Sequence, residues 1–127
     1  MTPTPERPRV YVASKSELHA YWRTWRATGL TDGFDIISTW IDEGDEGATA
    51  DWSDLWVRCI TEAASADVVV ALHRPADQWK GAFVEIGAAL AAGKRVHVVG
   101  APPGSWTAHP NVYRFGSVDD AFAAVGS

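Results

Sequence analysis

Residues 66–72 read ADVVVAL, and after a short connection residues 81–96 read GAFVEIGAALAAGKRV. The first stretch is almost entirely apolar, which is typical of a strand that helices cover on both faces. The second starts at a glycine, continues through helix-forming residues and reaches another glycine, Gly93, just before a second β-branched run. This succession predicts two parallel strands joined by a right-handed helical crossover.

The same alternation extends to both sides of that unit. Strands are predicted at 9–13 (RVYVA), 34–40 (FDIISTW), 95–100 (RVHVVG) and 112–115 (VYRF). Helices are predicted from a Ser14 cap to about residue 27 with a stop at Gly29, at 52–65, and after a Ser117 cap with Asp120 in the capping-box position. Inward-facing positions of the 52–65 helix are Leu55, Cys59, Ile60 and Ala63.

Five strands alternating with helices predict a single α/β domain over residues 1–127, with residues 1–8 frayed. The expected architecture is a three-layer α/β/α sandwich with a five-stranded parallel sheet in the flavodoxin-like order 2-1-3-4-5. In that order a ligand binds beyond the carboxyl ends of the first and third strands. The ends of residues 9–13 and 67–72 therefore mark the expected site.

The composition narrows the class of protein. The chain is 46% hydrophobic and 21% charged, typical of a soluble globular domain, and it has no apolar run long enough to span a membrane. Its net charge of −5 comes largely from acids clustered at 42–54. The sequence has no run of basic residues, which argues against a nucleic-acid duplex as a partner. A lone cysteine, Cys59, cannot form an internal disulfide, which favours the cytoplasm.

Glu85 is the most suggestive chemical residue. It lies near the start of the 81–92 helix, where the helix dipole would keep its carboxylate ionised, and Gly81 would let a ligand approach the backbone amides. The simpler interpretation is an acid that only complements the helix dipole. The spacing alone favours that simpler interpretation.

The block from residue 66 to 96 resembles the nucleoside 2-deoxyribosyltransferase family, which includes the deoxynucleoside 5′-monophosphate N-glycosidases. Gly81, Glu85, Gly87, Gly93 and Lys94 match the pattern of that family, and STWID at 38–42 resembles its small phage- or prophage-type members. The resemblance covers about residues 9–116. It implies that Glu85 is a nucleophile that attacks C1′ of a deoxyribose and displaces the base.

This chain departs from the family pattern at three positions. Ala82 stands where the transferases often have Thr, and Trp79 stands where the monophosphate glycosidases have Ser. The helper Asp of many relatives falls on Cys59, which leaves Asp54 as the nearest upstream substitute. We therefore carry Glu85 and Asp54 forward as the candidate catalytic pair.

Further candidates surround the expected site without metal-ligand spacing, and no metal or cofactor is expected. Lys80 would bind a 5′-phosphate or be a solvated loop residue, and Trp40 and Trp79 would stack on a base at the rim. The complete set of expected substrate-binding residues is Ser14, Trp40, Asp77, Trp79, Lys80, Gly81 and His109.

Two functions remain open from the sequence. The first is cleavage of the N-glycosidic bond of a 2′-deoxynucleoside or its 5′-monophosphate, by hydrolysis or base exchange. The alternative is a non-catalytic relative that binds a nucleoside or nucleotide, which the missing helper acid favours. Seven tryptophans, among them Trp22, Trp25 and Trp56 on helical stripes, indicate core packing or a homodimer interface.

Overall fold

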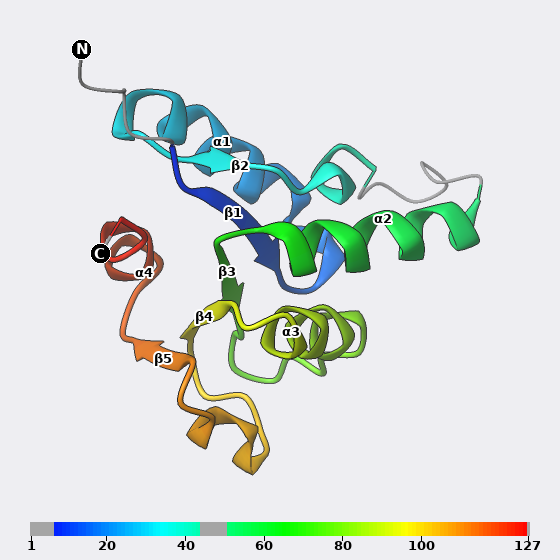
Figure 1. Ribbon diagram of the computed structural model, residues 1–127, viewed down its shortest axis with the longest axis vertical. Helices are drawn as coiled ribbons and strands as arrows, with labels where there is room; N and C mark the ends of the chain where they lie inside the picture. The colour runs from blue at the N-terminus through cyan, green and yellow to red at the C-terminus, as the bar shows by residue number, and fades with distance from the viewer. Residues whose placement is uncertain (1–6, 44–50, 127) are drawn as a thin grey trace.

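A computed structural model describes residues 7–43 and 51–126 and contains a five-stranded parallel sheet (Figure 1). The strand order is β2-β1-β3-β4-β5, which confirms the predicted flavodoxin-like arrangement. The strands span Arg9–Ala13 (β1), Asp35–Ile36 (β2), Val68–Leu72 (β3), Arg95–Val99 (β4) and Val112–Phe115 (β5). Every pairing is parallel, including Tyr11 with Val69 and Ala13 with Ala71 in the central pair.

Helices cover both faces of the sheet. Helices α2 and α3 pack together on one face, and α1 and α4 meet on the other, as Figure 1 shows. The helices are α1 (His19–Asp32), α2 (Trp52–Ser65), α3 (Gly81–Ala91) and α4 (Val118–Ala123), with short 3-10 turns η1 (Ser16–Leu18), η2 (Thr39–Asp42) and η3 (Ser105–Ala108). Within the described ranges no helix is both long and apolar enough to cross a membrane.

The core explains why the central strands are so apolar. Val68, Val69 and Val70 of β3 are completely buried because helices lie above and below them. On the α1–α4 side, Phe122 stacks on Trp25 and on Phe34, with ring centroids 4.4 Å and 4.8 Å apart. Helix α1 is therefore fixed to the sheet by aromatic packing.

The start and end of α1 differ from the sequence prediction. Ser14 does not cap the helix, because its hydroxyl accepts a hydrogen bond from Trp22 Nε1 and donates one to the Lys15 carbonyl. Gly29 does not end the helix either; a Cβ there would lie 2.5 Å from the Phe34 carbonyl oxygen, so glycine allows close packing. The helix ends at Gly33, whose φ of +91° is the left-handed geometry that glycine favours.

Three other sequence expectations need correction. The second strand covers only two residues, because the chain after Ile37 turns into η2. Arg7 is not frayed: its guanidinium pairs with Asp35 and donates hydrogen bonds to two backbone carbonyls, while residues 1–6 lie outside the described part. Ile60 is 38% exposed and does not face the core.

The helix cap predicted at Ser117 is present, and the structure shows a further one at Asp51. Ser117 accepts a hydrogen bond from the Asp120 amide at the start of α4, as the capping-box pattern predicted. Asp51 does the same for the Asp54 amide at the start of α2. The acidic segment before it, residues 44–50, lies outside the described residues.

Candidate active site

Glu85 lies in the second turn of α3 and is mostly shielded from water between the sheet and α2. The pKa of its carboxyl is raised to about 7, chiefly by burial; a hydrogen bond from the Tyr11 hydroxyl opposes the rise and the charge of Glu62 adds to it. This corrects the expectation of a carboxylate held fully ionised by the helix start. A carboxyl with a pKa near neutrality, placed at the switch point of an open α/β sheet, is a typical candidate for chemistry.

Tyr11 supplies the polar group nearest to that carboxyl from the sheet. It lies in the middle of β1, its side chain is completely buried, and its hydroxyl makes no hydrogen bond of normal geometry with any described residue. Burial and then the neighbouring charge of Glu85 raise the pKa of the phenol, so it is a neutral donor. The polar groups that act on this hydroxyl are the Glu85 carboxyl and the Cys59 thiol, so it lies beside the candidate nucleophile. The sequence alone does not single out Tyr11, because it reads as one more apolar residue of a strand.

Cys59 of α2 completes the buried group around Glu85. Its side chain is 4% exposed, and burial raises the pKa of the thiol to about 11, with the Glu85 charge adding to the shift. The thiol is therefore neutral and unreactive at physiological pH. Cys59 occupies the place of the expected helper acid but cannot act as one.

Asp54 does not replace that helper. Its carboxylate is 58% exposed and bound to Arg58 Nε at 2.9 Å, four residues along α2, and no contact joins it to Glu85 among the described residues. The nearer acid is Glu62, which accepts hydrogen bonds from the Thr39 amide at 3.0 Å and the Thr39 hydroxyl at 2.8 Å. Its charge reaches Glu85 electrostatically.

Trp56 lies beside the start of α3, one helical turn before Cys59 on α2. A Cβ added at Gly81 would lie 3.2 Å from Cη2 of the Trp56 indole, so the ring lies against the helix start. Trp56 is still 41% exposed. The Trp56 indole thus packs on Gly81, one helical turn before Glu85 in α3. The absence of a side chain at Gly81 leaves room for this contact.

The two tryptophans expected at the rim are buried instead. Trp40 is 8% exposed and donates its indole N–H to the Val12 carbonyl at 2.9 Å. Trp79 is 6% exposed, donates to the Leu72 carbonyl at 3.3 Å and packs on His73. Both were expected to stack on a base, and their burial and internal hydrogen bonds correct that expectation.

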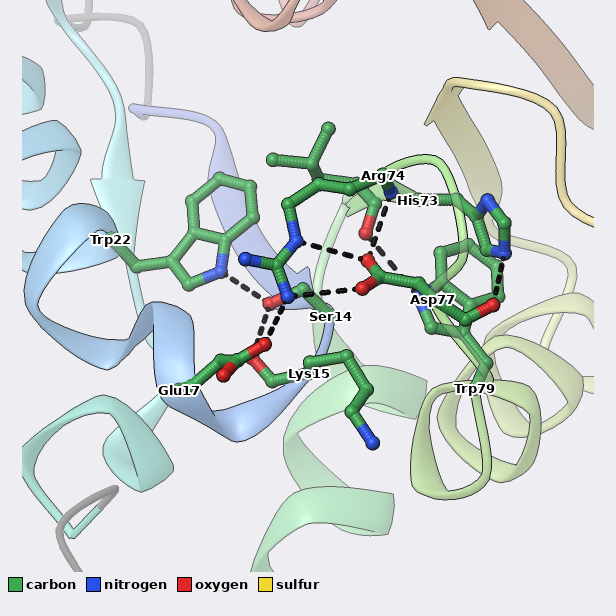
Figure 2. Close-up of polar contacts among 9 residues, drawn as sticks. Ser14, Lys15, Glu17, Trp22, His73, Arg74, Asp77 and Trp79 are labelled. Carbon is green, nitrogen blue, oxygen red and sulfur yellow. Dashed lines mark hydrogen bonds and ion pairs between the residues drawn. The ribbon is translucent and has the colours of Figure 1, made fainter.

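The loop between β3 and α3 holds Asp77 and Lys80 in different states. The Asp77 carboxylate accepts hydrogen bonds from the backbone amide and the guanidinium of Arg74 (Figure 2). These hydrogen bonds hold the pKa of Asp77 below its usual range. Lys80 is exposed at the position before α3 and makes no hydrogen bond or ion pair with the described residues. Lys80 is thus available to a ligand, whereas Asp77 is already occupied.

His109 lies away from the site. It is exposed in the turn before β5, where its Nδ1 accepts a hydrogen bond from the Asn111 amide. That turn is at the amino end of its strand, whereas Glu85 belongs to a helix that begins beyond the carboxyl end of β3. The parallel sheet separates these two edges, so the structure does not bring His109 together with Glu85, and its substrate contact stays a prediction.

A hollow of about 760 Å³ lies elsewhere, between α1 and α4. Its lining includes the stacked rings of Trp25, Phe34 and Phe122, together with Arg7 and Asp119. None of the candidate site residues borders it. Its aromatic rings are part of the packing that holds α1 to the sheet.

The fold and this buried carboxyl define a parallel α/β domain with an acidic group at its switch point. No family model and no curated protein matches the sequence. The fold is similar to that of the Clostridium botulinum CMP N-glycosidase BcmB, with a TM-score of 0.62, 16% identity and coverage of 84% of this chain and 86% of that one. It is also similar to a 2-desoxiribosyltransferase from Leishmania mexicana, with a TM-score of 0.65, 18% identity and coverage of 94% and 95%.

Proposed function

We propose that this protein is an enzyme that cleaves the N-glycosidic bond of a 2′-deoxynucleoside or its 5′-monophosphate. The observation that carries the proposal is the largely shielded Glu85 carboxyl, with a pKa of about 7, beside the buried hydroxyl of Tyr11. The similar structures of an N-glycosidase and a deoxyribosyltransferase support this class of reaction.

The proposed chemistry uses Glu85 as the nucleophile. Its carboxylate oxygen forms a bond to C1′ while the bond from C1′ to the base nitrogen breaks, and the base leaves with that electron pair and takes a proton from water. The sugar is then held as an ester on Glu85. Attack of water on C1′ releases the free sugar, and attack of a second base gives transfer.

Tyr11 and Trp56 have supporting roles in this proposal. The Tyr11 hydroxyl donates a hydrogen bond to the Glu85 carboxylate, which stabilises the charged form before attack. It donates to the same carboxylate again when the sugar has been released. The Trp56 indole stacks on the base, because an exposed aromatic face beside Gly81 suits a flat ring. Lys80 is the sequence-derived candidate for a 5′-phosphate, being exposed and uncommitted at the start of α3.

The neutral Cys59 thiol favours the second candidate, a nucleotide-binding protein without turnover. A thiol with a pKa of about 11 cannot protonate a departing base efficiently. Incubation of the protein with the deoxynucleosides and their 5′-monophosphates, followed by chromatography for free base, separates the two functions. Free base above the protein-free rate supports the enzyme, and saturable binding of an uncleaved ligand supports the binding protein.

A further inference from the structure

The Arg74 guanidinium links the two segments that follow β1 and β3. Arg74 follows β3 by two residues, and its Nη2 contacts the carboxylate of Glu17 in η1, the turn that follows β1 (Figure 2). These two strands are direct neighbours in the sheet, with Ala13 paired to Ala71. The ion pair therefore lies where an open α/β sheet of this order binds its ligand.

The two carboxylates that hold Arg74 differ in how firmly they are fixed. Asp77 has an 8% exposed side chain and accepts three hydrogen bonds from Arg74: from the amide at 2.8 Å, from Nε at 3.1 Å and from Nη2 at 2.9 Å. Glu17 is 64% exposed and contacts Nη2 alone. Asp77 thus sets the orientation of the guanidinium, and Glu17 is a solvent-exposed partner that another anion can replace.

The guanidinium also keeps unused donor capacity. Its Nη1 makes no hydrogen bond with the described part of the chain. An arginine that Asp77 positions, with a free edge, suits a phosphate, because a guanidinium binds phosphate oxygens in a two-pronged geometry.

We infer that Arg74 forms a subsite for a phosphate monoester and that the Glu17 carboxylate occupies this subsite in the unliganded protein. The identity of its natural ligand, the 5′-phosphate of a deoxynucleotide, rests on the proposed function. Tyr11 lies three residues before Ser14, roughly 10 Å along β1 at about 3.3 Å per residue. A substrate whose sugar lies at Glu85 and whose 5′-phosphate points toward this edge of the sheet would bring the phosphate to Arg74.

Charge explains why phosphate would displace Glu17. An exposed ion pair contributes little to stability, because water screens it and the long side chains lose freedom. A phosphate monoester carries a charge of about −1.5 to −2 at pH 7 and offers three oxygens. The guanidinium therefore gains more from the phosphate than it loses from Glu17, and Asp77 keeps it in place during the exchange.

Binding of inorganic phosphate tests the subsite without any catalytic assumption. Calorimetric titration of Glu17→Gln is expected to show affinity about two- to fivefold tighter than wild type, the change that corresponds to loss of an exposed ion pair. Arg74→Gln is expected to weaken phosphate binding at least tenfold. Asp42→Asn is the matched control. It frees Arg26 from a similar exposed ion pair, at 2.8 Å, that does not involve Arg74, so it should leave phosphate binding unchanged.

A second experiment measures the binding of deoxynucleosides and their 5′-monophosphates. It uses Glu85→Gln protein so that these ligands are not cleaved. The ratio of 5′-monophosphate to nucleoside affinity is expected to fall at least tenfold when Arg74→Gln is added, and less when Lys80→Ala is added. Unchanged phosphate affinity in Glu17→Gln, a variant of an exposed residue that should fold normally, overturns the subsite. So does an unchanged affinity ratio in a folded Arg74→Gln protein. If phosphate behaves as expected but wild type releases no base, the proposed function fails and the subsite stands.

Discussion

At the scale of single residues, Glu85 links burial to reactivity. Only the ionised carboxyl can attack C1′, and burial raises its pKa to about 7. We therefore predict that kcat/KM rises about tenfold per pH unit below neutrality and levels off above pH 7. Steady-state rates of base release between pH 5 and 9 measure this profile. A flat profile down to pH 5 would contradict a nucleophile with this pKa.

The same shift predicts a pH-dependent effect on stability. The folded pKa lies above the ordinary value of 4.5, so the folded state binds the proton more tightly, and ionisation of Glu85 destabilises the fold as pH rises from about 4.5 to 7. Glu85→Gln should therefore be more stable than wild type at pH 8, by about 1–3 kcal/mol. The difference should vanish near pH 4.5. Urea unfolding at both pH values gives the comparison, and equal stability at pH 8 would show that Glu85 is not destabilised by burial.

The candidate site shows what sequence patterns can and cannot predict at this scale. Glu85 was found because it follows a glycine at a helix start in a recognisable block. Tyr11 and Trp56 were missed, because strand alternation does not say which face meets a carboxyl and a helical stripe does not say which indole lies on Gly81. The burial of Trp40 and Trp79 depends on hydrogen bonds to backbone carbonyls that no local pattern encodes.

At the scale of elements, the contact between α2 and α3 shapes the site. Trp56 lies on Gly81, so its indole is proposed to form the wall against which the base stacks. We predict that Trp56→Ala lowers kcat/KM roughly tenfold or more, in line with the 1–3 kcal/mol typical of stacking one base on an aromatic ring. Trp52→Ala, one turn earlier and 68% exposed, is the matched control. Equal losses in the two variants would remove Trp56 from the site.

The elements themselves were largely predictable. The strand order was predicted from the alternation of apolar runs and helices, and the cap at Ser117 from its capping-box spacing. The errors occurred where tertiary contacts override local signals. Gly29 was predicted to end the helix, but it lies inside α1 and lets Phe34 pack closely against the helix backbone. The second strand is shorter than predicted because η2 brings the Trp40 indole to the Val12 carbonyl.

At the scale of the whole molecule, the exposed apolar surface of α2 predicts association. Trp22 is completely buried and cannot form an interface, whereas Trp52, Val57 and Ile60 are exposed on α2, and Val84 is exposed on α3. Large apolar side chains that are exposed together on a small domain are typical of a protein interface. We predict a homodimer through this surface, and Val57→Lys should shift it to monomer in light scattering at micromolar concentration. A wild-type monomer of 13.7 kDa would contradict the prediction.

The central claim is that Glu85 forms and breaks the bond to C1′. The most direct measurement compares base release by wild type and Glu85→Gln on whichever nucleoside or monophosphate wild type cleaves. Circular dichroism should show that both proteins are folded. The account predicts a loss of roughly 10³-fold or more, because the amide cannot act as the nucleophile. Near-normal base release by folded Glu85→Gln would contradict it.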